Sequence, residues 1–354
     1  MEKIGIILVN YKDYARRFLA PCRDSLRAQD YPASLFQVYI VDNASTPESQ
    51  EYLRSAYPEA VVIPRPDGNY AAANNAGFRQ AQADGCCYLV SANMDTEMAP
   101  AWLSELALAL DRNPEAAAAQ SKILLFPKTE EEKAHPLINS LGNRLHFFGF
   151  GFTSAYGEPD REIAGYPEIT GYPSGCSFIV RAEDFTAVGG YDEEYYMYHD
   201  DLELGLKLRL AGRKLVLAPR SVIFHKYEFS RSTKMVYYME RNRYLTLLAF
   251  YPAGLLIIFF IPLLLGALAV SFYSIIHGWF RENLRVAAYF FDPRTYALVS
   301  KWRQERRTWQ KVRFSKVASS FADRIEFKEV ANPFLRYVAN PLMSVFWKIA
   351  KVFA

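Results

Sequence analysis

The chain has 354 residues, 51% of them hydrophobic, so it can bury the core of one large domain or two ordinary ones. Its net charge of +3 is uneven, because residues 281–354 hold 15 basic and 6 acidic side chains and leave residues 1–280 with about −6. Four cysteines form neither a CxxC pair nor a zinc spacing, and the N-terminal apolar run is too short for a signal peptide. This pattern excludes a disulfide-rich secreted protein and places the front of the chain in the cytoplasm.

Predicted strands and helices alternate over the first 115 residues. Continuous apolar runs such as IGIILVNY indicate strands buried on both faces, as in a parallel sheet. The predicted strands cover 4–11, 36–45, 60–66 and 86–95, and the predicted helices cover 14–29, 51–58, 69–85 and 100–114. This alternation predicts an α/β fold with a mostly parallel sheet sandwiched by helices.

Three of these strands end in polar residues, Asn10, Asp42 and Asp95. In open α/β sheets, ligands bind outside the carboxyl ends of the strands. The pattern therefore predicts a ligand site at this edge, although any one of the three could instead cap the helix that follows it.

The pattern is less regular after residue 120. Residues 121–127 read as a strand and the Gly- and Phe-rich 145–159 as a loop or hairpin. Residues 171–193 read as a strand and a short helix that stops at a Gly-Gly pair, and 214–230 as one or two short strands. Between them, the alternating leucines of 202–210 fit a strand, whereas the acids before them and the Ala-Gly pair after them fit a capped helix. We interpret this segment as a broadly buried helix.

The motifs VNYKD, VDNAS, NYAAANNAG, NMD, SGCSFIVRAEDFTAVGGYDE, MYHDDLELGLKLRLAG and FHKYEFSRS…ERNR follow one another over residues 4–243. In this order they resemble the family 2 glycosyltransferases, inverting enzymes of the GT-A fold that include many rhamnosyltransferases. The resemblance implies a GT-A domain over 1–243, and it implies the roles that follow.

The resemblance implies a donor site for a nucleotide-diphosphate sugar. Its implied residues are Asn10, Asp42 and Asn43 for the nucleobase and ribose, Asn69, Asn74 and Asn75 near the donor, and Asn93 and Arg241 toward the phosphates. The family usually has glycine where this chain has Asn69, and asparagine tolerates the left-handed backbone of such a turn. Arg241 and Arg243 could neutralise a diphosphate or, alternatively, anchor the apolar segment that follows them.

The resemblance also implies a divalent metal, Mg²⁺ or Mn²⁺, bound by Asp95. Alternation along an extended NMD segment would place Asn93 and Asp95 on one face. Because one carboxylate alone binds a metal weakly, a second protein ligand is expected, and His225 is the candidate. Alternatively, His225 is a packed or capping histidine without a metal.

Asp201 matches the family's general base, with Asp200 and Glu203 in support. A neighbouring carboxylate and an aromatic wall would raise its pKa toward a useful value. The resemblance places Gly175, Cys176, Tyr198 and His199 on the acceptor side.

Residues 244–280 contain no Asp, Glu, Lys or Arg. The basic segment that follows should stay in the cytoplasm, so we expect a proline-broken, re-entrant or tight helical hairpin in the membrane, with a single tilted span as the alternative. Residues 281–354 then form a basic, amphipathic tail at the cytoplasmic face, where an anionic membrane fits better than nucleic acid.

The sequence thus predicts a membrane-associated, metal-dependent transferase of a sugar from a donor such as dTDP-rhamnose or a UDP-sugar to a lipid-linked or growing glycan. The alternatives are a nucleotidyltransferase acting on sugar phosphates and a membrane-anchored, non-catalytic glycan-binding protein. A nucleotidyltransferase is expected to carry a glycine-rich phosphate loop after its first strand, and VNYKDYARR has no glycine.

Overall fold

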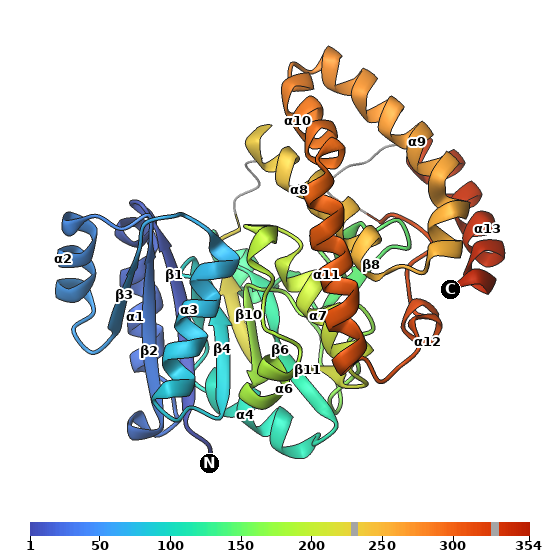
Figure 1. The fold of residues 1–354 in the computed structure, drawn as a ribbon. Helices are drawn as coiled ribbons and strands as arrows, with labels where there is room; N and C mark the ends of the chain where they lie inside the picture. The colour runs from blue at the N-terminus through green and yellow to red at the C-terminus, as the bar shows by residue number, and fades with distance from the viewer. Residues whose placement is uncertain (228–232, 327–332) are drawn as a thin grey trace. The chain divides into compact units, whose positions relative to one another are not determined.

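The computed structural model describes residues 1–227, 233–326 and 333–354, drawn as a ribbon in Figure 1. The chain divides into two compact units. Unit 1 comprises Met1–Asn143, Thr153–Arg209 and Arg213–Glu228, and unit 2 comprises Arg144–Phe152, Leu210–Gly212 and Phe229–Ala354. The predicted boundary after residue 243 falls inside a helix of unit 2.

Unit 1 is built on a mixed sheet that has nine strands in the described part of the chain, in the order β3-β2-β1-β4-β10-β6-β11-β5, with β7 beside β6. Its strands are β1 Ile4–Tyr11, β2 Phe36–Asn43, β3 Val61–Arg65, β4 Tyr88–Ala92, β5 Thr96–Met98, β6 Ala116–Leu125, β7 Ile138–Ser140, β10 Ser177–Arg181 and β11 Lys214–His225. The short strands β8 Asn143–Leu145 and β9 Gly151–Thr153 pair separately.

The α/β class is confirmed, and the first four strands are parallel as expected. However, β10 runs antiparallel to both β4 and β6, so the sheet as a whole is mixed. The chain reaches β10 through the long excursion 126–176 and not through a strand–helix–strand crossover, which is what would fix a parallel direction.

The helices of unit 1 are α1 Tyr14–Arg27, α2 Pro47–Ala56, α3 Tyr70–Ala83, α4 Trp102–Arg112, α5 Glu130–Ala134, α6 Ala182–Ala187 and α7 Asp200–Leu210. Helix α2 begins four residues before the predicted start, because Thr46 and Ser49 form a capping box with Pro47 at the first turn. The leucine-rich segment is a helix, α7, as predicted, and all five leucines are buried.

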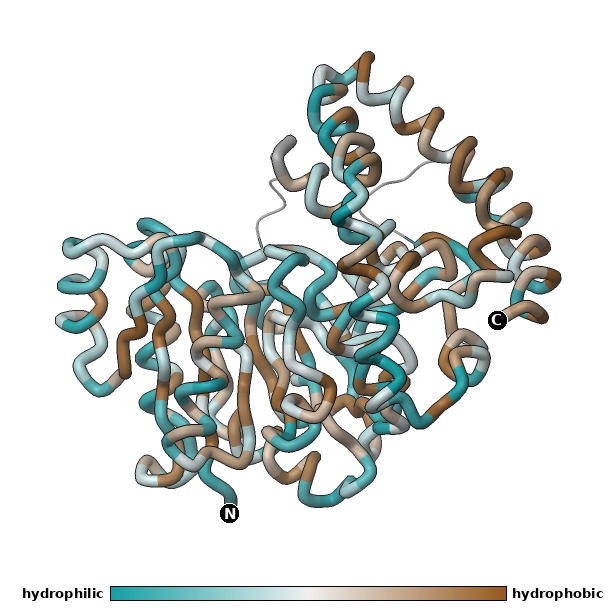
Figure 2. The backbone as a smooth tube through the Cα atoms, in the orientation of Figure 1, coloured by the Kyte–Doolittle hydropathy of each residue, from teal (hydrophilic) through white to brown (hydrophobic). Residues whose placement is uncertain are grey.

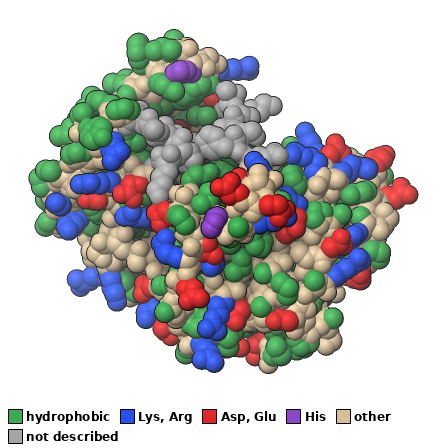
Figure 3. All heavy atoms as spheres, turned by 180° about the vertical axis from the view of Figure 1, so that it is seen from behind, with side chains coloured by type: hydrophobic (Ala, Val, Ile, Leu, Met, Phe, Trp, Pro, Cys, Tyr) green, Lys and Arg blue, Asp and Glu red, His purple; other side chains and the backbone are tan. Residues whose placement is uncertain are grey.

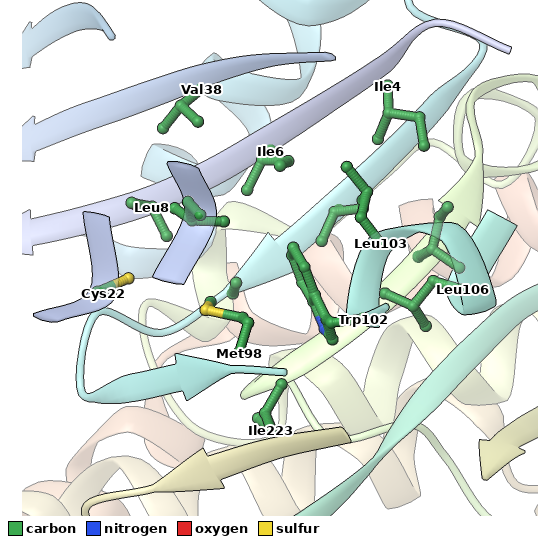
Figure 4. Packing of buried hydrophobic residues seen from close by; sticks show 14 of the residues in the cluster. Ile4, Ile6, Leu8, Cys22, Val38, Met98, Trp102, Leu103, Leu106 and Ile223 are labelled. Atoms are coloured by element: carbon green, nitrogen blue, oxygen red, sulfur yellow. The ribbon is translucent and has the colours of Figure 1, made fainter. Parts of the chain in front are cut away.

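The core of unit 1 lies between the sheet and the helices α1 and α4 (Figure 4). Ile4, Ile6 and Leu8 of β1 point into it and meet Trp102 and Leu106 of α4. The Trp102 indole donates hydrogen bonds to two buried serines, at 2.9 and 3.0 Å, so even its polar atom is satisfied. This packing fixes the strand ends that form the candidate site.

Unit 2 is helical, with α8 Thr233–Phe250, α9 Ala253–Ile276, α10 Phe280–Phe291, α11 Pro293–Trp309, α12 Phe314–Ala318 and α13 Asn340–Ala350. Figure 2 shows apolar residues along most of α9 and α13. The sequence predicts a proline break within residues 244–280. It does not occur at Pro262, because α9 runs unbroken through that residue, and the chain turns at Pro252 instead. A proline removes one backbone donor, and long helical flanks on both sides keep the helix intact around it.

Candidate active site

Asn10 and Asp42 meet at the carboxyl edge of the sheet. Strands β1 and β2 are parallel and in register, so these two residues are direct partners, and the Asn10 amide donates a hydrogen bond of 2.7 Å to Asp42. Both are buried, and Ser45 and Ser49 also donate to Asp42. The neighbouring Asn43 keeps a buried side-chain oxygen without a partner among the described residues, which is a feature expected of a ligand-binding group.

The asparagines of α3 bond to the protein itself. Asn69 caps the helix through the Ala72 amide and donates to the Glu193 carbonyl, while Asn75 exchanges two hydrogen bonds with the backbone of Tyr191. The structure therefore gives Asn69 and Asn75 a positioning role, and a donor contact by either residue stays a prediction.

Two further expectations for this segment change. The left-handed residue of the turn is Gly68, at φ +73°, whereas Asn69 has an ordinary φ of −75°. Asn74 is buried and bonds Tyr70 and Ser91, so it braces the helix against β4.

Residues 93–95 form a turn and not the expected extended segment. Asn93 accepts a hydrogen bond from the Tyr70 hydroxyl, and its backbone N–H donates to the Cys176 carbonyl. Asp95, two residues later, points to His225, the last residue of β11. Asn93 and Asp95 therefore do not share one face through strand alternation.

Asp95 and His225 lie side by side. Strand β11 pairs antiparallel with β5, and the Lys226 amide bonds the Asp95 carbonyl, which brings His225 Nε2 to 3.3 Å from an Asp95 carboxylate oxygen. The other ring nitrogen of His225 lies 2.9 Å from the side-chain oxygen of Asn139 on β7. Asn139 was not predicted, and it leaves Nε2 as the nitrogen that faces Asp95.

Opposite charges couple the two groups. Burial raises the pKa of Asp95, but the hydrogen bond and charge of His225 outweigh it and hold that pKa below its usual value. Burial likewise disfavours the charged imidazole, yet Cys176 and Asp95 together raise the pKa of His225 to about 10. Without a metal the pair is thus an ion pair.

The pair fits a divalent cation. The second carboxylate oxygen of Asp95 is buried and has no hydrogen-bond partner among the described residues. No cluster of three or more His, Cys, Asp or Glu side chains that could hold a metal occurs in the described part of the chain. Two protein ligands are compatible with an ion that takes its remaining ligands from substrate phosphates and water.

Asp200 and Asp201 open α7 in different environments. Asp200 is 5% exposed, whereas Asp201 is only partly buried and lies against Gly175. The two carboxylate oxygens of Asp201 accept the Gly175 amide at 3.1 Å and the Leu202 amide at 2.8 Å. Asp201 is therefore the carboxylate that a substrate can reach.

Burial raises the pKa of Asp201 to about 6, against the lowering effect of its backbone hydrogen bonds. Burial, followed by the charge of Asp201, raises the pKa of Asp200 well above its usual value. Burial also raises the pKa of Glu203 to about 7, although Glu203 pairs with Lys207. Asp201 thus suits a general base near neutral pH, whereas burial and the charge of Asp201 favour the neutral form of Asp200.

The residues before α7 have unusual backbone. Tyr196, Tyr198 and His199 all have positive φ, between 62° and 63°, which costs about 1–2 kcal/mol for each non-glycine residue. The Tyr196 carbonyl accepts the first two amides of α3, and the His199 carbonyl accepts the Glu203 amide. These bonds hold a strained segment beside the candidate base, as is common at functional sites.

A cavity of about 380 Å³ opens beside His225 in unit 1. Aromatic rings and cationic side chains form much of its wall, namely Phe18, Phe126, Tyr156, Tyr227, Lys128 and Lys226. Its volume falls in the range typical of small-molecule sites. The predicted acceptor-side residue Cys176 interacts with this histidine, and burial raises the pKa of its thiol.

Arg241 and Arg243 belong to unit 2. Arg241 is buried against the rings of Tyr237, Tyr238 and Tyr289. Arg243 pairs with Glu240 at 2.7 Å and donates to a backbone carbonyl of the same unit. A phosphate contact by Arg241 stays a prediction.

The sheet and its edge site define a glycosyltransferase of the GT-A fold. A solved structure of GalNAc-T7 with UDP, GalNAc and Mn²⁺ shares the fold at a TM-score of 0.53 and 13% identity, over 72% of this chain and 49% of that one. A family model for glycosyl transferase family 2 matches residues 5–185, which is half of the chain. The chain belongs to glycosyl transferase family 2.

Two relatives show how far the similarity reaches. The O-antigen biosynthesis protein RfbC of Myxococcus xanthus is 32% identical over 255 residues, which cover 70% of this chain but 19% of that protein. The N-acetylglucosaminyl-diphospho-decaprenol L-rhamnosyltransferase of Mycobacterium tuberculosis is 28% identical over 241 residues, or 63% of this chain and 76% of that protein.

Proposed function

We propose that this glycosyltransferase moves a sugar, with inversion, from a nucleoside-diphosphate sugar to a hydroxyl of a lipid-linked or growing cell-surface glycan. The observation that carries the proposal is the closeness of two centres. Asp201, with a pKa of about 6, bonds Gly175, and the next residue, Cys176, interacts with His225 of the Asp95–His225 pair. A base and an anion-stabilising centre therefore lie one residue of backbone apart, which suits an in-line displacement between them.

Each group has a role in this reaction. Asn10, Asp42 and Asn43 would hold the nucleoside, because they are buried at the carboxyl ends of β1 and β2 and Asn43 keeps an unused acceptor. Asp201 would take the proton of the acceptor hydroxyl as that oxygen attacks the anomeric carbon and the nucleoside diphosphate leaves.

Asp95 and His225 would hold Mg²⁺ or Mn²⁺, with Asn139 orienting the imidazole. Bound there, the cation supplies charge for the leaving diphosphate. Mn²⁺ accompanies UDP in the GalNAc-T7 structure, which supports a divalent ion for this chain.

The acceptor class follows from the relatives and from α9. The mycobacterial relative is named for a decaprenol-linked acceptor, and the apolar α9 would keep this chain at the cytoplasmic face of the membrane beside such a lipid. Two alternatives, a nucleotidyltransferase acting on free sugar phosphates and a non-catalytic glycan-binding protein, are less consistent with an accessible base of raised pKa.

The test is direct. Purified protein is incubated with dTDP-rhamnose, UDP-sugars and GDP-sugars, Mn²⁺ or Mg²⁺, and undecyl-diphospho-N-acetylglucosamine, and both nucleoside diphosphate and glycosylated product are measured. Coupled release of both by at least one donor is expected. Formation of pyrophosphate and a nucleotide sugar in a parallel incubation with nucleoside triphosphate and sugar 1-phosphate would point to a nucleotidyltransferase, and binding without any turnover would leave a glycan-binding protein.

A further inference from the structure

We infer that α9 and α13 together form a membrane seat, an apolar surface that lies in the face of an anionic lipid bilayer and does not cross it. The inference rests on the membrane association within the proposed function and specifies its geometry. It concerns unit 2 alone.

Helix α9 exposes apolar side chains on every turn. Among described residues it is the one helix long and apolar enough to cross a membrane, and only 11% of its apolar window is buried. Large side chains more than half exposed recur along it, namely Ile257, Phe260, Ile261, Leu265, Leu268, Phe272, Ile275 and Ile276. A patch of this size is not stable in water and marks an interaction surface.

Both ends of α9 are tied to the same helix, α8. At its start, the chain turns from α8 through Tyr251 and Pro252 directly into α9. At its end, α10 folds back onto α8. There the ring centres of Tyr244 and Phe290 lie 5.8 Å apart, and the guanidinium carbon of Arg285 lies 4.3 Å from the ring centre of Tyr237.

Helix α11 brings the chain back to the end of α8, where α9 begins. Arg303 and Arg306 donate to the carbonyls of residues 248–251, which end α8 and begin the turn after it, at 2.6–3.1 Å. The chain thus runs about 36 Å along α9 and returns through α10 and α11 to where it began. If α9 crossed the bilayer, the return path would carry the ten charged side chains of 281–309 back through it. This return path therefore places both ends of α9 on the same side of the bilayer.

Helix α13 exposes an apolar stripe although it buries polar side chains. Its inner face carries Asn340 and Ser344 beside Trp347 and Ala350. The two polar side chains bond the backbone of Ile325 and the carboxylate of Asp323. The outer stripe, at least 59% exposed, is formed by Leu342, Val345 and Ile349 and is continued by Val352 just after the helix. An outward apolar stripe of this kind is expected where the outer medium is lipid.

The two helices belong to one surface. Phe259 of α9 packs on Phe346 and Trp347 of α13, with ring centres 5.8 and 6.3 Å apart, so their exposed faces flank a shared aromatic contact. In Figure 3, hydrophobic side chains cover much of this unit.

Charge selects the kind of lipid. Exposed Lys348 and Lys351 border the α13 stripe, Arg281 follows the end of α9, and residues 333–354 contain no acid. A basic fringe around an apolar surface favours an anionic leaflet.

Flotation with preformed vesicles tests the seat. The full chain should bind vesicles of phosphatidylcholine with phosphatidylglycerol, and bind phosphatidylcholine alone at least tenfold more weakly. Leu265→Glu on α9 and Val345→Glu on α13 should each lower partitioning about tenfold or more, because a carboxylate then faces the lipid. Val61→Glu, the same change at an exposed valine of unit 1, should leave it within twofold.

Topology is read from labelling. Gln304→Cys on α11 and the native exposed Cys87 of unit 1 are treated with a membrane-impermeant maleimide on sealed vesicles. Equal labelling supports the seat, whereas a protected residue 304 beside a labelled Cys87 overturns it. Loss of partitioning in the α9 variant but not the α13 variant also overturns the two-helix surface. Nucleoside-diphosphate binding by the same samples reports on the proposed function separately and should not change.

Discussion

Replacing Asp201 by asparagine separates a catalytic carboxylate from a structural one. At pH 7.5 the carboxyl is mostly ionised, because its pKa is about 6, so Asp201→Asn removes the base that is available in the native chain. General base catalysis contributes about 10²–10⁴ in rate, which corresponds to about 2.7–5.5 kcal/mol of transition-state stabilisation. We expect kcat to fall by that factor.

The same change has a structural part that can be worked out. Both Asp201 oxygens accept backbone amides, from Gly175 and Leu202, and an asparagine offers only one oxygen. Its NH₂ group then faces a backbone donor, which should lower the free energy of unfolding by about 1–3 kcal/mol. This loss is too small to unfold an ordinary domain at 25 °C, so catalysis and folding can be measured separately.

Asp200→Asn is the matched control. Asp200 is buried with a pKa well above its usual value, which favours its neutral form, and an amide is a neutral group of nearly equal size. Its kcat should change less than tenfold. Both variants are compared by nucleoside-diphosphate release at saturating donor, with urea unfolding on the same protein. The reasoning fails if Asp201→Asn keeps more than a tenth of native kcat, or if Asp200→Asn loses as much as Asp201→Asn.

Three further outcomes follow from the site. Below pH 6, kcat/KM should fall about tenfold per pH unit as Asp201 takes up its proton, and a flat profile from pH 5 to 8 would remove Asp201 as the titrating base. Asn139→Leu strips the partner from His225 and should weaken Mn²⁺ binding in the presence of nucleoside diphosphate about 10–100-fold by calorimetry; unchanged affinity would show that Asn139 does not orient the imidazole. Gly205→Ala puts a Cβ 2.5 Å from that of Tyr172, so urea unfolding should show a net loss of about 1–2 kcal/mol, whereas a gain in stability would mean that α7 shifts freely.

The strand-end residues could be predicted because their geometry follows from local pattern. Asn10 and Asp42 end continuous apolar runs, and parallel neighbouring strands bring their carboxyl ends to one edge. Asp95 and His225 were chosen by resemblance, and only the β5–β11 pairing shows that they touch.

Other features leave no trace in the sequence. Asn139 sits in a strand of three residues and reaches a partner 86 positions away, so no periodicity marks it. The positive φ of Tyr196 accompanies hydrogen bonds from the distant Tyr70 and Ala71 amides to its carbonyl, in a residue type that rarely adopts this conformation. The leucine ladder of α7 misleads for another reason, because alternate residues also satisfy i, i+4 spacing when a helix is buried on all sides.

The anomeric configuration of the product tests the central claim most directly. The glycoside formed from an α-linked nucleotide sugar, such as UDP-N-acetylglucosamine or whichever donor turns over, is identified by proton NMR, in which the anomeric coupling constant reports its configuration. A single displacement with Asp201 as base and the Asp95–His225 centre at the leaving group predicts a β-linked product. An α-linked product would contradict the account, because it requires a second displacement or attack on the same face of the sugar.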